Sequence, residues 1–220
     1  MDIAKYIDHT LLKAVATPAD IEKLCNEALK YKFFSVCVNS CYVTEAYNYV
    51  KDSSTKVCSV IGFPLGAMST QAKAFEAKQA ILDGAAEIDM VINVGQLKAG
   101  NTNFVMEDIK AVKDAIGDHV LKVIIETCYL TNEEKKTASE LAVKANADFV
   151  KTSTGFGTGG ATPEDIQIMK DSVDGQAKLK ASGGVRDFET AKMYIEKGVD
   201  RLGTSNGIAI IEGFTASEGY

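Results

Sequence analysis

Short runs of apolar residues alternate with longer amphipathic segments along the whole chain. Eight runs are rich in Val, Ile and Phe and are apolar on successive residues, a pattern typical of strands buried on both faces. These predicted strands are Tyr6–Leu12, Ser35–Asn39, Lys56–Phe63, Glu87–Val94, Leu121–Thr127, Asp148–Ser153, Lys178–Ser182 and Arg201–Thr204. Helical periodicity between them predicts helices at Ala19–Tyr31, Ala72–Asp83, Asn132–Ala145 and Asp187–Lys197.

The helix boundaries carry regular signals. Residues 17–20 and 162–165 both read Thr-Pro followed by a residue and an Asp. Thr can cap a helix, Pro fits its first position, and an acid in the first turn suits the helix dipole. At the other ends, Gly84, Asn146 and Gly198 each come shortly before an acid and a strand. Gly and Asn tolerate the left-handed conformation that ends a helix, so we expect helices to stop there.

Strict alternation of strands and helices predicts a parallel sheet with helices outside it. Eight strands in 220 residues fit a closed (β/α)₈ TIM barrel at the compact end of its size range. A doubly wound open sheet is the main alternative. No linker-like stretch or change of composition divides the chain, so we expect one domain over residues 1–220 with a short C-terminal tail.

Composition excludes several classes of function. Hydrophobic residues make up 46%, enough for a full core, and the net charge of −6 disfavours nucleic acid and anionic membranes as partners. We expect neither a signal peptide nor a membrane span, because no apolar run approaches the roughly 20 residues required. The five cysteines are odd in number and scattered, which favours reduced thiols in the cytoplasm. Two distant histidines, and Cys37 and Cys41 without a second pair, predict no metal site.

Three charged residues interrupt otherwise apolar strands. Lys151 and Lys180 lie near the ends of consecutive predicted strands, and Asp89 lies within an earlier one. Neighbouring strands would project both lysines into one space, where like charge and desolvation should lower the pKa of at least one. A neutral lysine is a nucleophile towards carbonyls, and Asp89 could pair with a lysine and transfer protons. Lys178, nearer the start of its strand, is expected to be solvated.

Glycine-rich loops follow the last three strands. Residues 155–160 satisfy G-x-G-x-x-G after a strand, but the next strand does not end in the acid that a dinucleotide fold requires, so we reject that interpretation. Residues 182–187 (SGGVRD) and 203–207 (GTSNG) occupy the usual phosphate position of barrels. Ser182, Thr204 and Ser205 can donate hydrogen bonds there. The only arginines, Arg186 and Arg201, also fall in this part of the sequence. Glycines that merely serve tight turns are the alternative.

At these residues the chain closely resembles the deoxyribose-phosphate aldolase family of class I, Schiff-base-forming aldolases with a (β/α)₈ barrel. The matching stretches extend over almost the whole chain. They are YIDHTLLK at 6–13, SVCVN at 35–39, VIGFPLGA at 60–67, EIDMVINVG at 87–95, KVIIET at 122–127, DFVKTSTGF at 148–156 and KASGGVRD at 180–187.

The resemblance implies roles for individual residues. The family's Schiff-base lysine falls on Lys151, its second lysine on Lys180 and its catalytic aspartate on Asp89. Asp8 and Thr10 match members of a proton-relay network. The residues that match its phosphate contacts are Gly155, Gly183, Gly184, Gly203, Thr204, Ser205 and Asn206, with Arg186 as a further candidate.

Two positions differ from the family pattern, and the last residue of the chain matches it. Ser40 stands where a proline is common, and Asn206 stands where Ser or Ala is frequent, which could alter phosphate affinity. A terminal tyrosine often assists proton transfer in the family, and Tyr220 occupies that place.

The implied activity is reversible cleavage of 2-deoxy-D-ribose 5-phosphate to glyceraldehyde 3-phosphate and acetaldehyde. It requires no cofactor and no metal, and its partners are phosphosugars and small aldehydes. A homodimer is the expectation from the symmetry preference of oligomers. Two other kinds of function stay open on the residues alone. One is a different phosphosugar enzyme, an isomerase or decarboxylase, in which the lysines only bind oxyanions. The other is a phosphosugar-binding barrel without turnover.

Overall fold

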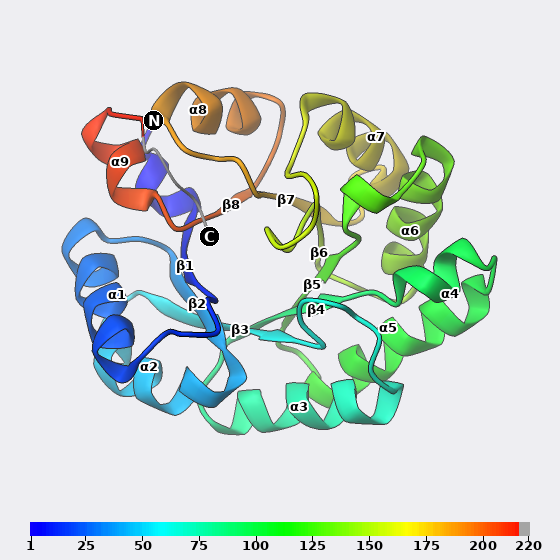
Figure 1. Cartoon of the computed structure of the whole chain (residues 1–220), viewed down its shortest axis with the longest axis horizontal. Coiled ribbons are helices and arrows are strands. Elements are labelled where there is room, and N and C mark those ends of the chain that lie inside the picture. The colour runs from blue at the N-terminus through cyan, green and yellow to red at the C-terminus, as the bar shows by residue number, and fades with distance from the viewer. Residues whose placement is uncertain (216–220) are drawn as a thin grey trace.

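Eight parallel strands close into a barrel in the computed structural model, which describes residues 1–215 (Figure 1). Each strand pairs with the next along the chain, and β1 pairs with β8 to close the sheet. The strands are β1 Ile7–Leu11, β2 Ser35–Asn39, β3 Lys56–Ile61, β4 Glu87–Val91, β5 Val120–Ile124, β6 Phe149–Lys151, β7 Lys178–Ser182 and β8 Arg201–Thr204. The closed (β/α)₈ barrel is therefore confirmed, and the open sheet is excluded.

Helices form a ring around the strands (Figure 1). The α-helices are α1 Pro18–Tyr31, α2 Val43–Val50, α3 Thr70–Leu82, α4 Val94–Lys98, α5 Thr102–Ile116, α6 Asn132–Lys144, α7 Pro163–Val173, α8 Phe188–Glu196 and α9 Gly207–Glu212. Short 3₁₀ helices occur at Ile3–Tyr6, Ser40–Tyr42 and Thr127–Tyr129. None of the helices in residues 1–215 is long and apolar enough to cross a membrane.

The predicted helix boundaries are confirmed. Thr17 and Thr162 each form a capping box with the Asp three residues on, with Pro at the first helical position. Gly84, Asn146 and Gly198 have φ angles of 113°, 59° and 98°, so each helix ends in the left-handed region before its next strand. These local signals fix where helices begin and end, so that each short helix is followed by the next strand.

Strand residues alternate between two environments. One face, which includes Val36, Ile88 and Val123, packs against the helices in the main hydrophobic core. The other face points into the barrel, where an apolar group of Cys37, Cys58 and neighbours fills one side. Charged side chains fill much of the remaining interior, because the intervening strand positions carry acids and lysines. The barrel interior therefore contains both a small apolar group and a set of buried charged side chains.

All eight predicted strands are correct in place, and Ser35–Asn39, Lys178–Ser182 and Arg201–Thr204 have the observed bounds, but the other five predicted strands extend too far at their C-terminal ends. The stretch after β4 becomes helix α4 at Val94, and β5 ends at Ile124, before a 3₁₀ turn that contains Thr127. In both places the apolar run continues past the barrel rim, where parallel pairing ends and the chain turns outward. Apolar character therefore marks burial here rather than strand bounds.

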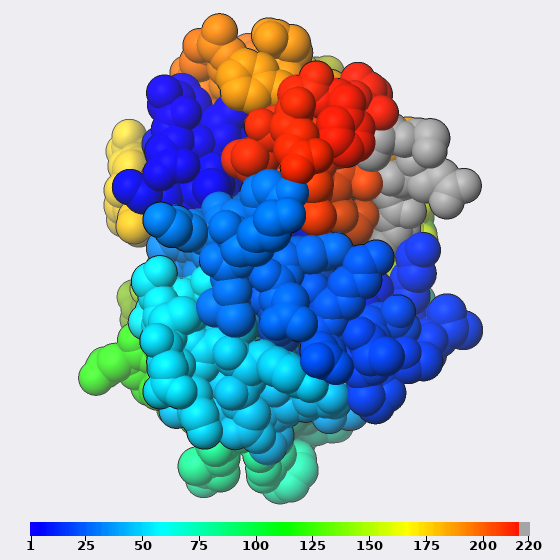
Figure 2. Space-filling model, turned by 90° about the vertical axis from the view of Figure 1, so that its left-hand side faces the viewer, coloured from blue at the N-terminus to red at the C-terminus, as the bar shows by residue number. Residues whose placement is uncertain are grey.

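The two ends of the described chain lie side by side. Figure 2 shows α9 next to the first residues of the chain and above the wall that α1 and α2 form. The Tyr31 hydroxyl of α1 donates a hydrogen bond of 2.5 Å to Glu212 of α9. The last helix thus helps to hold β8 against β1 where the barrel closes.

Candidate active site

Asp89 stands at the centre of the buried charges. Its Oδ2 accepts hydrogen bonds of 2.8 Å from both Lys151 Nζ and Lys180 Nζ, and its Oδ1 accepts one of 2.8 Å from Lys122 Nζ. Asp89 lies on β4, in register with Lys122 on β5, while Lys151 and Lys180 are in register across β6 and β7. The barrel thus brings the two predicted lysines and the predicted carboxylate into direct contact.

A second carboxylate extends this cluster towards β1. Asp8 binds Lys180 Nζ at 2.5 Å and Arg201 Nη1 at 2.8 Å, and it accepts a hydrogen bond from Ser35 Oγ at 2.6 Å. Arg201 also pairs with Glu87 at 3.1 Å, and Glu87 pairs with Lys122 at 2.7 Å. We call these seven residues the ionic cluster: Asp8, Glu87, Asp89, Lys122, Lys151, Lys180 and Arg201.

Mutual pairing sets the charges of this cluster. Burial would raise the pKa of Asp8, but Lys180, Arg201 and Lys122 outweigh it and hold that pKa below its ordinary value. Burial is likewise outweighed at Asp89, whose pKa lies well below its usual range because of the three lysines. Both carboxylates are therefore ionised at neutral pH.

The pKa of Lys180 is raised rather than lowered. Burial does lower the pKa of this ammonium, but Asp8 and Asp89 outweigh burial and the nearby Lys122, so the pKa is raised. Lys122 behaves in the same way beside Asp89 and Glu87. These two lysines stay protonated and act as fixed cations or proton donors.

Three members of the ionic cluster were not predicted as site residues. Glu87 and Lys122 lie near the starts of their predicted strands, where a charge usually faces water. Arg201 was expected near the phosphate loops, but its guanidinium lies 3.4 Å from the centre of the Phe34 ring and pairs with Asp8 and Glu87 inside the barrel. Lys178, by contrast, is exposed as predicted. The position of a charged residue within its predicted strand therefore does not distinguish the buried residues from the exposed one.

A glycine makes room for Lys180. A Cβ atom on Gly203 would lie 2.3 Å from Ser182 Oγ, so that the Ser182 side chain would have to move, and 3.0 Å from Lys180 Cε, a tight contact. Gly203 is in register with Ser182 on the adjoining strand. The residue type at this inward position of β8 therefore sets the position of the second lysine.

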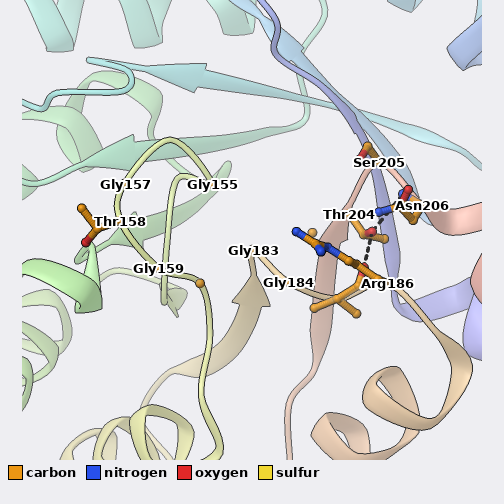
Figure 3. Close-up of a pocket in the computed structure, with 13 residues that line it drawn as sticks. Gly155, Gly157, Thr158, Gly159, Gly183, Gly184, Arg186, Thr204, Ser205 and Asn206 are labelled. Carbon is orange, nitrogen blue, oxygen red and sulfur yellow. Dashed lines mark hydrogen bonds between the residues drawn. The ribbon is translucent and has the colours of Figure 1, made fainter. Parts of the chain in front are cut away.

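The glycine loops enclose a single cavity of about 240 Å³ at the C-terminal ends of β6, β7 and β8 (Figure 3). The residues that match the family's phosphate contacts all line it, as does Arg186, whereas Ser182 does not. The lining is Gly155, Gly157, Thr158, Gly159, Gly160, Gly183, Gly184, Val185, Arg186, Gly203, Thr204, Ser205 and Asn206. Arg186 lines the cavity together with the glycine loops (Figure 3), so a guanidinium and main-chain atoms border the same space. This composition suits an anion.

Backbone contact joins two of these loops. The Ala161 amide donates to the carbonyl oxygens of Ser182 and Gly183 at 3.0 and 3.2 Å. A Cβ on Gly160 would lie 2.3 Å from Gly183 O. Glycine at 160 is thus required for the loops after β6 and β7 to meet, which forms one wall of the cavity.

Several predicted residues lie in unexpected surroundings. The Thr204 hydroxyl donates to Val185 O at 2.8 Å and accepts from Asn206 N at 2.9 Å, so it braces the turn. Ser182 is fully buried beside Gly203 and does not line the cavity. Thr10 donates to the main-chain carbonyl of Asp8 rather than to a cluster side chain. Tyr220 lies outside the described residues.

One group of possible metal ligands occurs among residues 1–215. Cys37 Sγ, Cys58 Sγ and an Asp89 oxygen lie within 4.8 Å of one another. Lys122 donates to Cys58 at 3.3 Å, and three ammonium groups already bind Asp89, so the surroundings repel a cation. Cys41 is exposed and does not join Cys37. These residues do not suit a metal ion.

The fold and the site together define a TIM barrel with lysines buried around a carboxylate and an anion cavity at the C-terminal face, where barrel enzymes carry their active sites. Residues 3–210 match the model of the DeoC/LacD family aldolases, and the chain belongs to this family.

Relatives and solved structures agree with this assignment. A deoxyribose-phosphate aldolase of Finegoldia magna is 62% identical over 97% of this chain and 100% of its own length. One of Carboxydothermus hydrogenoformans is 60% identical over 99% of this chain and 97% of its own length. The tetrameric deoxyribose phosphate aldolase of Aeropyrum pernix superposes with a TM-score of 0.87 at 30% identity, covering 96% of this chain and 89% of that one.

Proposed function

We propose that this protein reversibly cleaves 2-deoxy-D-ribose 5-phosphate to D-glyceraldehyde 3-phosphate and acetaldehyde through a Schiff base on Lys151. The observation that carries the proposal is the position of Lys151. Its Nζ is buried against Asp89 at 2.8 Å, and the loop that continues from its strand lines the anion cavity. The lysine amine and the cavity therefore belong to one strand and the loop that follows it.

The charge balance of the ionic cluster supports a nucleophilic Lys151. The cluster contains four cationic side chains and three carboxylates, so one positive charge is in excess. Within the described residues Lys151 makes one ion pair, whereas Lys122 and Lys180 each bind more than one carboxylate. Lys151 is thus the lysine of the cluster with the fewest carboxylate partners among the described residues. As an amine it can attack an aldehyde.

The covalent steps balance without a cofactor. The Lys151 amine adds to C1 of the open-chain sugar, and loss of water leaves an iminium ion. Departure of the C3 hydroxyl proton lets the C2–C3 bond break: its electrons form the C1=C2 double bond, and the π electrons of the iminium pass to nitrogen. This step releases glyceraldehyde 3-phosphate and leaves an enamine. Protonation of the enamine and addition of water then free acetaldehyde and restore the lysine.

The surrounding residues serve proton transfer and binding in this proposal. Asp89 touches both Lys151 and Lys180, so it can relay protons between the reacting nitrogen and the protonated lysine. Asp8 orients Lys180, and Thr10 supports Asp8 through its carbonyl. The phosphate binds in the cavity and converts remote binding energy into positioning at C1. Tyr220 remains a candidate for enamine protonation, as the resemblance suggests.

The test traps the covalent intermediate. The protein is incubated with deoxyribose 5-phosphate and borohydride, weighed intact and mapped by peptide mass, alongside Lys151→Arg and the matched control Lys178→Arg. We expect a reduced adduct on Lys151 in the wild type and in Lys178→Arg, and none in Lys151→Arg. Phosphosugar binding without any adduct would indicate an isomerase, a decarboxylase or a binding protein, and would remove this role from Lys151.

We further propose a cytoplasmic homodimer. All five cysteines are free, which suits a reducing compartment. Two-fold dimers are the commonest closed assemblies. Light scattering after gel filtration tests the dimer: the mass of a monomer or a tetramer would contradict it.

A further inference from the structure

Glu126 occupies a bulge directly beside Lys151. Just beyond β5, the amide of Ile125 donates to Lys151 O at 3.0 Å and the amide of Thr127 donates to Thr152 O at 2.9 Å. The donors are two residues apart but the acceptors are consecutive, so the chain holds one residue more on the side of Glu126. Glu126 takes up the extra length with φ 55° and ψ 66°, a left-handed conformation that favours glycine.

The carboxylate of Glu126 accepts hydrogen bonds from the loop that follows Lys151. It is buried, with 3% of the residue exposed. Its Oε1 accepts the Thr154 amide at 3.1 Å, and its Oε2 accepts the Thr154 hydroxyl. The Thr154 hydroxyl in turn accepts the Phe156 amide at 3.0 Å. One carboxylate therefore fixes the start of residues 154–157, which we call the clamp loop.

The clamp loop fits closely over this carboxylate. A Cβ on Gly157 would lie 2.7 Å from Cys128 Sγ and 3.3 Å from Glu126 Cδ. Gly155 and Gly157 also line the anion cavity on their other side. Glu126 thus lies behind the cavity wall and has no place in its lining, so its effect on a bound anion must pass through the loop.

Two costs accompany this arrangement. A non-glycine residue in a left-handed conformation is strained, and a buried carboxylate is unfavourable without compensation. Within residues 1–215 the donors to the Glu126 carboxylate are the amide and hydroxyl of Thr154 and, at 4.0 Å, the thiol of Cys128, and none of them is a cation. A glycine would form the same bulge without either cost. The presence of a glutamate at this position is therefore explained by the hydrogen bonds of its carboxylate to Thr154.

We infer that Glu126 is a positioning residue, which holds the clamp loop at the distance from Lys151 that a phosphorylated aldehyde requires. The inference rests on the proposed function and adds a determinant of substrate class to it. The bulge amides fix the backbone at Lys151 and Thr152, whereas the carboxylate fixes only the loop. Loss of the carboxylate should thus weaken recognition of the phosphate and leave the amine chemistry of Lys151 intact.

The test compares Glu126→Gln with wild type on two substrates, 2-deoxyribose 5-phosphate and unphosphorylated 2-deoxyribose, with inorganic phosphate as competitive inhibitor. Glu133→Gln, an exposed glutamate at the start of α6, is the matched control. In Glu126→Gln one Thr154 donor loses its acceptor, so the KM for the phosphosugar and the inhibition constant of phosphate should both rise about tenfold. The value of kcat/KM for unphosphorylated deoxyribose should stay within about twofold of wild type.

Other outcomes overturn the inference. Unchanged phosphate recognition in Glu126→Gln would do so, as would an equal loss on both substrates, because the residue would then act on the chemistry or the fold. Glu126→Asp, whose shorter side chain cannot reach both Thr154 donors, should shift the same constants in the same direction. If neither variant folds by circular dichroism, the carboxylate is a folding requirement and the inference is wrong. Absence of turnover in the wild type would instead refute the proposed function.

Discussion

Replacement of Asp8 by Asn should show how strongly the ionic cluster stabilises the barrel. The side chain is fully buried and contacts Lys180, Arg201 and Ser35 at 2.5 to 2.8 Å. Asn has nearly the same shape, so the change removes charge with little change in volume. Lys180 and Arg201 would remain buried with one carboxylate fewer.

The expected loss is large relative to the stability of a domain. Removing one partner of a buried ion pair destabilises proteins by about 3–5 kcal/mol. A typical domain has a free energy of unfolding of about 5–15 kcal/mol. Urea unfolding of Asp8→Asn at pH 7 should therefore show a midpoint far below that of the wild type. The matched control is Asp2→Asn, since Asp2 pairs with Lys5 in an exposed position at 3.4 Å and should contribute little.

The pH dependence gives a second readout with a defined sign. The pKa of Asp8 is lowered in the folded protein, so the stability due to its ionisation is present above its unfolded pKa of about 3.9 and is lost as the pH falls below it. Asn cannot titrate. The difference in unfolding free energy between wild type and Asp8→Asn should therefore be constant from pH 7 to 5 and shrink below about pH 4. A difference under about 1 kcal/mol at pH 7, or one independent of pH, would refute the reasoning.

Two further changes test the close contact at Gly203 and a second buried ion pair, which joins helices α3 and α5. Gly203→Ala should lower kcat at least about tenfold, because its Cβ would press on Ser182 and Lys180, and Ser182→Ala in the same chain should restore part of it; steady-state kinetics unaffected by Gly203→Ala would contradict this. Lys73 of α3 is buried and binds Asp108 of α5 at 2.6 Å, so Lys73→Met should cost about 3–5 kcal/mol in urea unfolding, and the double variant Lys73→Met/Asp108→Leu should cost less. Additive losses would show that the pair is not coupled.

The sequence was sufficient for the architecture and for the centre of the site. Alternation of buried strands and capped helices predicts a barrel, and Lys151, Lys180 and Asp89 are conspicuous because they interrupt apolar strands. These signals depend only on neighbouring residues, so they can be recognised in the sequence without any knowledge of the fold. The contact of all three residues then follows from parallel register.

The rest depended on information that a linear pattern does not contain. Lys122 and Lys178 both lie near the starts of predicted strands and both are in register with Phe149, yet Lys122 is buried against Asp89 and Lys178 is exposed. Neither the position of a lysine along its strand nor a local pattern specifies which of the two is buried. Glu126 was not predicted either. A left-handed residue is usually recognised in a sequence by a glycine, and this position carries a glutamate.

Closure of the barrel has a consequence for the newly synthesised chain. Asp8 and Arg201 are 193 residues apart in sequence but share a hydrogen bond of 2.8 Å. Until β8 has been made, Asp8 lacks Arg201, and a barrel of seven strands would enclose charges without their partners. Such a partial barrel is penalised electrostatically as well as by its open sheet edges. The ionic cluster therefore favours stable folding only once β8 is present, so that the buried charges and the closed barrel form in the same step.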